Sequence, residues 1–165
     1  MKLNMILLNE IEVNKKDKTT TCITNVKNCL ITHQISNIFY LPNSSKISMS
    51  LIERCFLMIG DSKNFLELDF YYVKKTISSN ELNIDSELQV FNAADSWLSH
   101  DITQRSKYAK DLLSKVRLPL LSIPVLKQIL DRVSSKYYEC SHICGAVLLK
   151  KQQIHTTICK ITSRY

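Results

Sequence analysis

Glycine is nearly absent from this 165-residue sequence. Gly60 and Gly145 are the only two, whereas an average usage of about 7% would give roughly eleven or twelve. Phosphate-binding loops of the GxxxxGK[ST] or GxGxxG type need several glycines in close succession, so nucleotide-binding sites built on such loops are excluded. Sheets rich in tight hairpins are also disfavoured, because their turns use glycine at positive φ.

Long hydrophobic runs are missing as well. No stretch approaches the roughly 20 apolar residues of a membrane-spanning helix. The apolar run Met5–Leu8 is too short for the core of a signal peptide and is followed by Asn9 and Glu10. We therefore expect no membrane association and an intracellular location, in the cytoplasm or also the nucleus. In such a reducing compartment the six cysteines would be thiols rather than a disulfide framework.

The charge is unevenly distributed along the chain. The formal net charge is +7, and residues 101–165 hold twelve basic against four acidic residues. These cations are scattered and are not grouped with aromatic residues on one face, as they would be in a nucleic-acid site. A solvated basic surface is therefore favoured over nucleic-acid binding, with an acidic protein partner as a third alternative.

Apolar residues recur with a helical period from Asn25 to about Gln153, where the last helix is expected to end. The clearest helix places Ile47, Leu51, Cys55 and Ile59 at every fourth position and has Gly60 at its end. No alternating strand pattern competes. The sequence therefore predicts an all-α fold of successive antiparallel helical hairpins. Its expected organisation is a poorly ordered lead-in over residues 1–24, a helical domain over 25–155 and a tail over 156–165.

Four residues near the C-terminus have the spacing of a zinc site. Cys140, Cys144, His155 and Cys159 follow the pattern C-x3-C-x10-H-x3-C, and thiolates and imidazole are the ligands that zinc prefers. The alternative is that Cys140 and Cys144, one helical turn apart, are small hydrophobic residues on an inner face. We favour that alternative, and no nucleophile stands in a recognisable catalytic signature. Catalysis, a metal and a cofactor are therefore not expected.

The order of the motifs resembles the BACK domain, the helical segment between the BTB domain and the Kelch propeller of Kelch-like proteins. The resemblance extends from Asn28 to His155, without a BTB-like segment before it or Gly-Gly-containing Kelch blades after it. We expect a BACK-like module without those two parts. The matching motifs are Asn28-Cys29-Leu30, Asn64-Phe65-Leu66-Glu67-Leu68, Asn80-Glu81-Leu82-Asn83-Ile84, Val90-Phe91 with Trp97, and Val116-Arg117-Leu118-Pro119-Leu120.

The resemblance implies a non-catalytic interaction module. BACK domains act in substrate adaptors of cullin-3 RING ubiquitin ligases, and their first hairpin, the three-box, helps the BTB domain to bind cullin. Here that hairpin corresponds to about Asn28–Ile59, and the expected cullin contacts are Leu30, Phe39 and Leu41. The alternative function is a small basic helical domain that binds nucleic acid through its C-terminal third.

Three further residues form the expected structural signature. Trp97, the single tryptophan, is expected to anchor the core from a long amphipathic helix. Pro119 cannot continue a helix and is expected to place Leu118 in an extended conformation. Arg117 is expected to satisfy the carbonyl groups at the end of that preceding helix, with partner binding as the alternative.

Overall fold

A computed structural model describes the backbone of residues 26–162 and the side chains of residues 26–156. Helices joined by short turns make up this range, which contains no strand, so the predicted all-α fold is confirmed. None of the described helices is both long and apolar enough to cross a bilayer. The predicted lead-in, residues 1–24, lies outside the described residues. The α-helices are α1 (Cys29–Ile38), α2 (Pro42–Arg54), α3 (Phe56–Ile59), α4 (Lys63–Leu66), α5 (Phe70–Ile77), α6 (Glu87–His100), α7 (Ile102–Arg105), α8 (Ala109–Leu113), α9 (Ile123–Lys136) and α10 (Ser141–Thr162).

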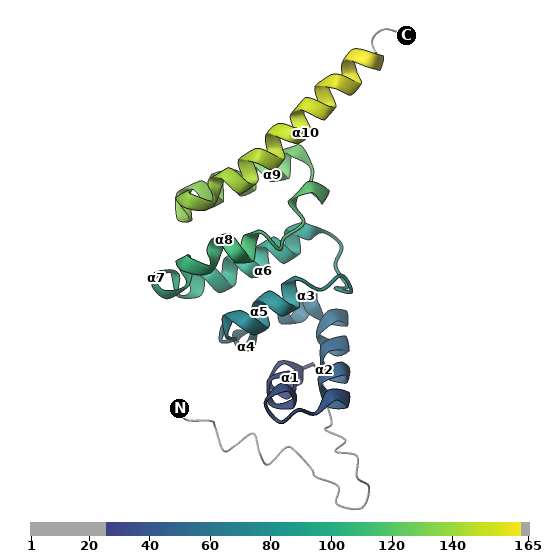
Figure 1. The fold of residues 1–165 in the computed structure, drawn as a ribbon, viewed down its shortest axis with the longest axis vertical. Helices are drawn as coiled ribbons and strands as arrows, with labels where there is room; N and C mark the ends of the chain where they lie inside the picture. The colour runs from purple at the N-terminus through teal and green to yellow at the C-terminus, as the bar shows by residue number, and fades with distance from the viewer. Residues whose placement is uncertain (1–25, 163–165) are drawn as a thin grey trace, which may run out of the picture.

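The helices form a stack along the long axis of the molecule (Figure 1). The α1–α2 hairpin lies at one end, followed by α3–α5, then α6–α8, and the α9–α10 hairpin lies at the other end. The last helix begins at Ser141 and continues to Thr162, beyond the end predicted near Gln153. The backbone of this helix therefore extends into the predicted C-terminal tail.

Helix α2 packs against α1 through small polar residues. Ser44, Ser48 and Ile52 are buried, whereas Ile47 is 60% exposed. The helix breaks at Cys55, and α3 continues from Phe56. Of the four residues whose spacing identified this helix in the sequence, Ile59 is in the core and Leu51 and Cys55 pack against it, so only Ile47 departs from the predicted buried face. Serines let the two helices approach closely, and the larger apolar side chain at position 47 is left outside.

Trp97 on α6 lies at the centre of the core. Its indole Nε1 donates a hydrogen bond to the Leu68 carbonyl at 2.9 Å, so its polar group is satisfied inside the protein. The Arg105 guanidinium lies 4.1 Å from the ring and donates to the carbonyls of Leu66 and Trp97, each at 2.8 Å. The Arg105 guanidinium therefore links α4 to α6 above the indole ring and has a structural role.

A buried carboxylate at the start of α6 fixes the Val116–Leu120 segment. Glu87 accepts a hydrogen bond from the Arg117 backbone N–H at 2.8 Å and pairs with its guanidinium at 3.7 Å. The guanidinium also donates to the Ser79 carbonyl at 2.8 Å and to Asn80 Oδ1 at 2.6 Å. The expectation that Arg117 binds carbonyls at the end of the preceding helix is therefore wrong. Glu87 binds the backbone N–H of Arg117, and the Arg117 side chain reaches the connection between α5 and α6.

A second buried carboxylate joins α6 to the last hairpin. Asp95 accepts from the Arg132 guanidinium at 2.7 Å, from Lys136 Nζ at 3.0 Å and from the Tyr137 hydroxyl at 3.1 Å. Burial is the main cause that raises the pKa of Tyr137 to about 12, so its hydroxyl stays protonated and donates at neutral pH. Pro119 lies in the 3-10 turn Leu118–Leu120, which connects α8 to this hairpin. The expectation that Leu118 is extended is therefore wrong, because Leu118 is the first residue of this turn.

The turn between α1 and α2 holds a tyrosine in the left-handed region. Tyr40 has φ of 54° and is the one described non-glycine residue with positive φ. The Leu41 N–H donates to the Ser36 carbonyl at 2.8 Å across this turn, the bond of a Schellman motif, whose left-handed position usually holds glycine. Tyr40 is 90% exposed, so packing of its side chain does not offset the backbone strain.

We therefore predict that Tyr40→Gly raises the free energy of unfolding, by up to about 1 kcal/mol, because glycine adopts the left-handed conformation without a Cβ clash. Tyr40→Ala is the matched control, since it also removes the ring but keeps the Cβ and the strain. Urea denaturation of both variants measures the difference. Equal stabilities for the glycine and alanine variants would contradict the assignment of strain to this position.

Candidate protein interface at the first hairpin

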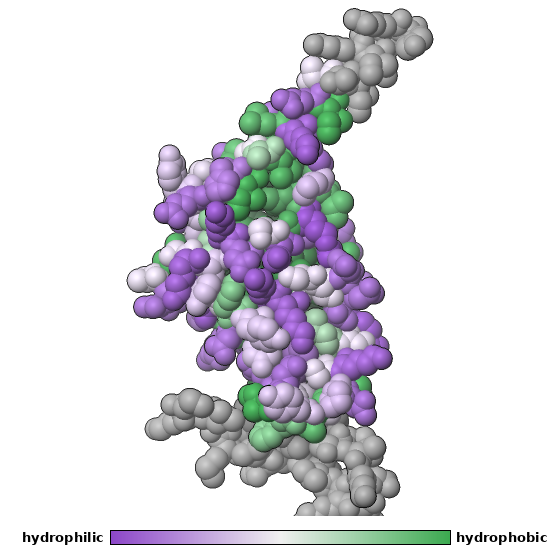
Figure 2. Space-filling model, in the orientation of Figure 1, coloured by the Kyte–Doolittle hydropathy of each residue, from purple (hydrophilic) through white to green (hydrophobic). Residues whose placement is uncertain are grey.

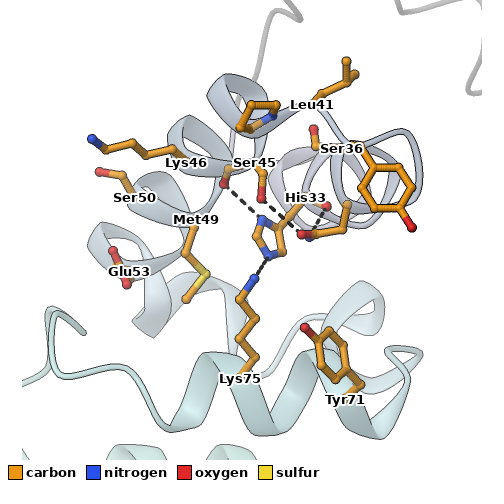
Figure 3. Close-up of a pocket in the computed structure, with 13 residues that line it drawn as sticks. His33, Ser36, Leu41, Ser45, Lys46, Met49, Ser50, Glu53, Tyr71 and Lys75 are labelled. Carbon is orange, nitrogen blue, oxygen red and sulfur yellow. Dashed lines mark hydrogen bonds between the residues drawn. The ribbon is translucent and has the colours of Figure 1, made fainter.

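An open groove of about 1000 Å³ runs along the α1–α2 hairpin and is closed on one side by α5 (Figure 3). Helix α1, the turn after it and α2 form most of its wall, and α5 adds Tyr71 and Lys75. The lining combines apolar groups with hydroxyls and amines, which suits a peptide segment better than a purely apolar ligand. The remaining lining residues are His33, Ser36, Asn37, Tyr40, Leu41, Pro42, Ser45, Lys46, Met49, Ser50 and Glu53.

The three residues expected to contact cullin lie in different environments. Phe39 is 64% exposed at the tip of the hairpin, and the half-buried Leu41 lines the groove. Leu30 is only 5% exposed and belongs to the core, so its inclusion among the exposed contact residues is wrong. Apolar residues occur on more than one side of α1, so its sequence pattern alone does not show which of them face the core and which face solvent.

Helix α1 has a second apolar face that points away from the core. Ile31 and Ile35 are half-buried and Ile38 is exposed, and none of them packs against the core cluster. Their spacing of i, i+4 and i+7 places them on one side of the helix. Figure 2 shows apolar surface at this end of the molecule and again around α9–α10, with a largely hydrophilic surface between them. Among the residues that the structure describes, this face of α1 therefore lies outside the core cluster.

His33 forms the floor of the groove and is almost fully buried. Its Nε2 lies 3.3 Å from Lys75 Nζ, while its Nδ1 lies 3.1 Å from Ser48 Oγ and 3.2 Å from the Ser45 carbonyl. An ammonium group can only donate, so Nε2 accepts and Nδ1 carries the proton. Figure 3 shows how this network connects α1, α2 and α5 beneath the groove. The role of His33 could not be predicted from the sequence, because its partners come from two other helices, α2 and α5.

The His33 network holds the groove together and does not create a nucleophile. His33 Nδ1 carries a proton and donates it to Ser48 Oγ, so the imidazole cannot act as a base toward that hydroxyl. The Ser48 hydroxyl in turn donates a hydrogen bond to the Ser44 carbonyl at 2.8 Å. Burial, reinforced by the charge of Lys75, lowers the pKa of His33. The imidazole is therefore neutral at physiological pH, which is the state that can accept from Lys75.

The cysteine spacing that resembles a zinc site does not form a ligand cluster among the described side chains. No group of three or more His, Cys, Asp or Glu within residues 26–156 is placed to hold a metal ion. Cys140 and Cys144 are buried, whereas His155 is exposed, and the side chain of Cys159 lies outside the described residues. Burial raises the pKa of both thiols, that of Cys144 to about 11, so they are protonated at neutral pH.

Several cations of the basic C-terminal third are used internally. Arg105 covers Trp97, Arg117 binds Glu87, and Arg132 with Lys136 binds Asp95. Side chains held by buried partners are not free to follow a phosphate backbone. The net charge of this region therefore overstates the number of cations available for nucleic acid.

We predict that His33 makes the protein less stable below about pH 6.5, the pKa of an unperturbed histidine. Its pKa is lowered in the folded state, so on acidification the unfolded chain binds a proton that the folded chain does not. The free energy of unfolding should therefore fall between about pH 7 and about pH 5, and His33→Gln should flatten this dependence. His100→Gln, at an exposed position, is the control and should keep the wild-type slope. The same slope in His33→Gln would rule out the assignment.

The groove and the apolar tip lie within a segment that matches a known protein family. The family model of BACK, "BTB And C-terminal Kelch", matches residues 29–131, which begin at α1 and end within α9. This match includes the first hairpin, both buried carboxylates of α6 and the segment around Arg117.

Individual relatives match more than half of the chain. Human Kelch repeat and BTB domain-containing protein 3 is 32% identical over 106 residues, which are 64% of this chain and 17% of the relative. Mouse Kelch-like protein 28 is 34% identical over 88 residues, or 53% of this chain and 14% of the relative. Xenopus tropicalis Kelch-like protein 25 is 29% identical over 140 residues, or 80% of this chain and 24% of the relative. The chain thus spans less than a quarter of each relative, and by the family match it belongs to the BACK domain family of Kelch-like and BTB-Kelch proteins.

Proposed function

We propose that this chain is a non-catalytic interaction module whose first hairpin contacts cullin-3 beside a BTB domain, as part of a substrate adaptor for ubiquitin ligases. The resemblance to the three-box of Kelch-like adaptors suggests this partner. The observation that carries the proposal is the apolar surface of the α1–α2 hairpin. Its outer face and its tip expose large side chains that the core does not use.

The outer face of α1 suits the BTB domain. Ile31, Ile35 and Ile38 form one stripe along the helix, and the family name, "BTB And C-terminal Kelch", associates this domain with BTB. A stripe of this kind is typical of a helix that packs against another domain. Its three isoleucines would give the BTB contact an apolar centre.

The tip and the groove suit an apolar cullin segment. Phe39 and Tyr40 are exposed at the tip, and Tyr40, Leu41 and Met49 line the groove beside it. Tyr40 has a positive φ, and backbone strain of this kind is commonly concentrated at binding sites. Leu30 supports this surface from the core and makes no direct contact in this proposal.

The cullin surface of this chain alone is small. A stable complex usually buries well over about 1,000 Å², and here the hairpin would share that area with BTB. We therefore expect weak, transient binding of the isolated chain to the cullin-3 N-terminal region. Fusion to a BTB domain supplies the rest of the surface.

We predict that a BTB domain fused upstream of Asn28 binds the cullin-3 N-terminal region more tightly than the same BTB domain alone. Phe39→Ala in the fusion should weaken binding at least about fivefold, because truncation of an exposed aromatic anchor typically costs more than 1 kcal/mol. Isothermal titration calorimetry measures both effects. Tyr138→Ala is the matched control, since Tyr138 is also an exposed aromatic residue but lies between α9 and α10, outside residues 28–59.

Two results would count against this function. If the fusion binds cullin-3 no more tightly than the BTB domain alone, residues 28–59 do not contact cullin and are a structural spacer. Tight binding by the isolated chain would show that the hairpin is a complete cullin site, contrary to the shared surface proposed here.

A further inference from the structure

The sequence before the described residues divides into two parts of different composition. Residues 5–13, Met-Ile-Leu-Leu-Asn-Glu-Ile-Glu-Val, hold six apolar side chains and two glutamates. Residues 14–21 hold no apolar side chain and are rich in lysine and threonine. Solvated linkers contain few large aliphatic residues, because exposure of such residues to water is unfavourable. The composition is that of an apolar binding segment on a polar tether.

The groove of the α1–α2 hairpin offers the apolar contacts that this segment needs. Its volume of about 1000 Å³ is large enough to hold several side chains. Met49 on α2 is half-buried in its wall, and the exposed ring of Tyr71 approaches from α5. Leu41 extends the same lining to the turn after α1. Aliphatic side chains can therefore bind along the length of the hairpin.

The charges of the groove complement the two glutamates of the segment. Lys46 is exposed and takes part in none of the ion pairs within residues 26–156. Lys75 extends from α5 toward His33 (Figure 3) and uses one of its three donors there. The single acid of the lining, Glu53, already accepts a hydrogen bond from the Ser79 hydroxyl at 2.6 Å. The groove is therefore net basic toward a bound segment.

The tether is long enough to bring the segment to the groove. Residues 14–25 separate it from Val26, and a stretch of this length spans at most about 40 Å. The groove runs along α1, whose ten residues correspond to about 15 Å. Tethering also raises the local concentration of the segment to the millimolar range. A contact with a Kd of about 0.1 mM would then be formed in about nine-tenths of the molecules.

We propose that residues 5–13 bind in the α1–α2 groove of the same chain, with aliphatic side chains against Met49 and Tyr71 and glutamates facing Lys46 and Lys75. The contact lies within one chain, so it does not rest on cullin as the partner of the hairpin. Of the lead-in that the sequence predicts to be poorly ordered, only the tether would remain so. Where the proposed cullin contact also holds, the segment competes with cullin for the groove.

Two other placements suit the segment less well. The outer stripe of α1 is apolar, but this helix contains no lysine or arginine, so the two glutamates would lie there without a partner. The groove of a second copy offers the same groups as that of the first. At micromolar protein concentration, however, it cannot match the local concentration of a tethered segment.

The test places the photo-crosslinker p-benzoylphenylalanine at Leu7 of the full chain and locates the link by mass spectrometry. We expect a link within one chain, to peptides that contain Met49 or Tyr71. The same crosslinker at Thr20, in the polar tether, is the control and should not give this link. Ile6→Ser combined with Leu8→Ser should lower the yield at least about fivefold, because the burial that drives binding is lost.

A charge reversal tests the electrostatic part of the inference. Lys46→Glu should lower the yield of the link, and the effect should be larger at low than at high salt. Lys127→Glu is the matched control, since Lys127 is also an exposed lysine but lies on α9, and it should keep the wild-type yield. Circular dichroism verifies that each variant folds.

The inference is overturned by a link to the outer face of α1, by links only between two chains, or by equal links from Leu7 and Thr20. Equal yields for Lys46→Glu and Lys127→Glu at low salt would also contradict it. The assay contains no cullin, so the two proposals can fail separately. A link in the groove, without a gain in cullin binding by the BTB fusion, would remove the proposed function and keep this contact.

Discussion

Glu87 and Asp95 both project from α6 into the core, and each brings a cation from a later part of the chain with it. A carboxylate buried without a partner would be strongly destabilising, so the positions of Arg117 and Arg132 follow from the two acids. Glu87 fixes the segment that leads out of α8, and Asp95 fixes the helix that follows. Because Lys136 and Tyr137 also bind Asp95, the whole α9–α10 hairpin is anchored at one point of α6.

This anchoring has a consequence for function. In a stack of hairpins each layer contacts mainly its neighbours, so the two end layers retain faces that no other layer covers. At one end these are the outer stripe of α1 and the tip at Phe39 and Tyr40, and at the other end they are the projecting turns of α10 (Figure 1). The stack therefore places these two ends at opposite ends of the long axis of the molecule (Figure 1).

The sequence predicted the features that depend on local pattern. Helical periodicity and the breaks at Gly60 and Pro119 were enough for an all-α fold of hairpins, and the position of Trp97 in a long amphipathic pattern indicated a core helix. Features that depend on distant partners were missed. The pattern shows that Glu87 and Asp95 are acidic residues in a helix, but not that they are buried opposite Arg117 and Arg132. Likewise, α1 has apolar residues on two sides, so spacing could not separate the buried Leu30 from the exposed Phe39.

The anchoring of the last hairpin by Asp95 can be measured directly by native-state hydrogen exchange of the wild type and Asp95→Asn. Asparagine keeps the shape of the side chain but removes the charge that holds Arg132 and Lys136. If Asp95 is the anchor, amides of α9 and α10 lose protection in the variant, while those of α1 and α2 keep theirs. Unchanged protection in α9 and α10, or an equal loss in all hairpins, would contradict the central role assigned to this carboxylate.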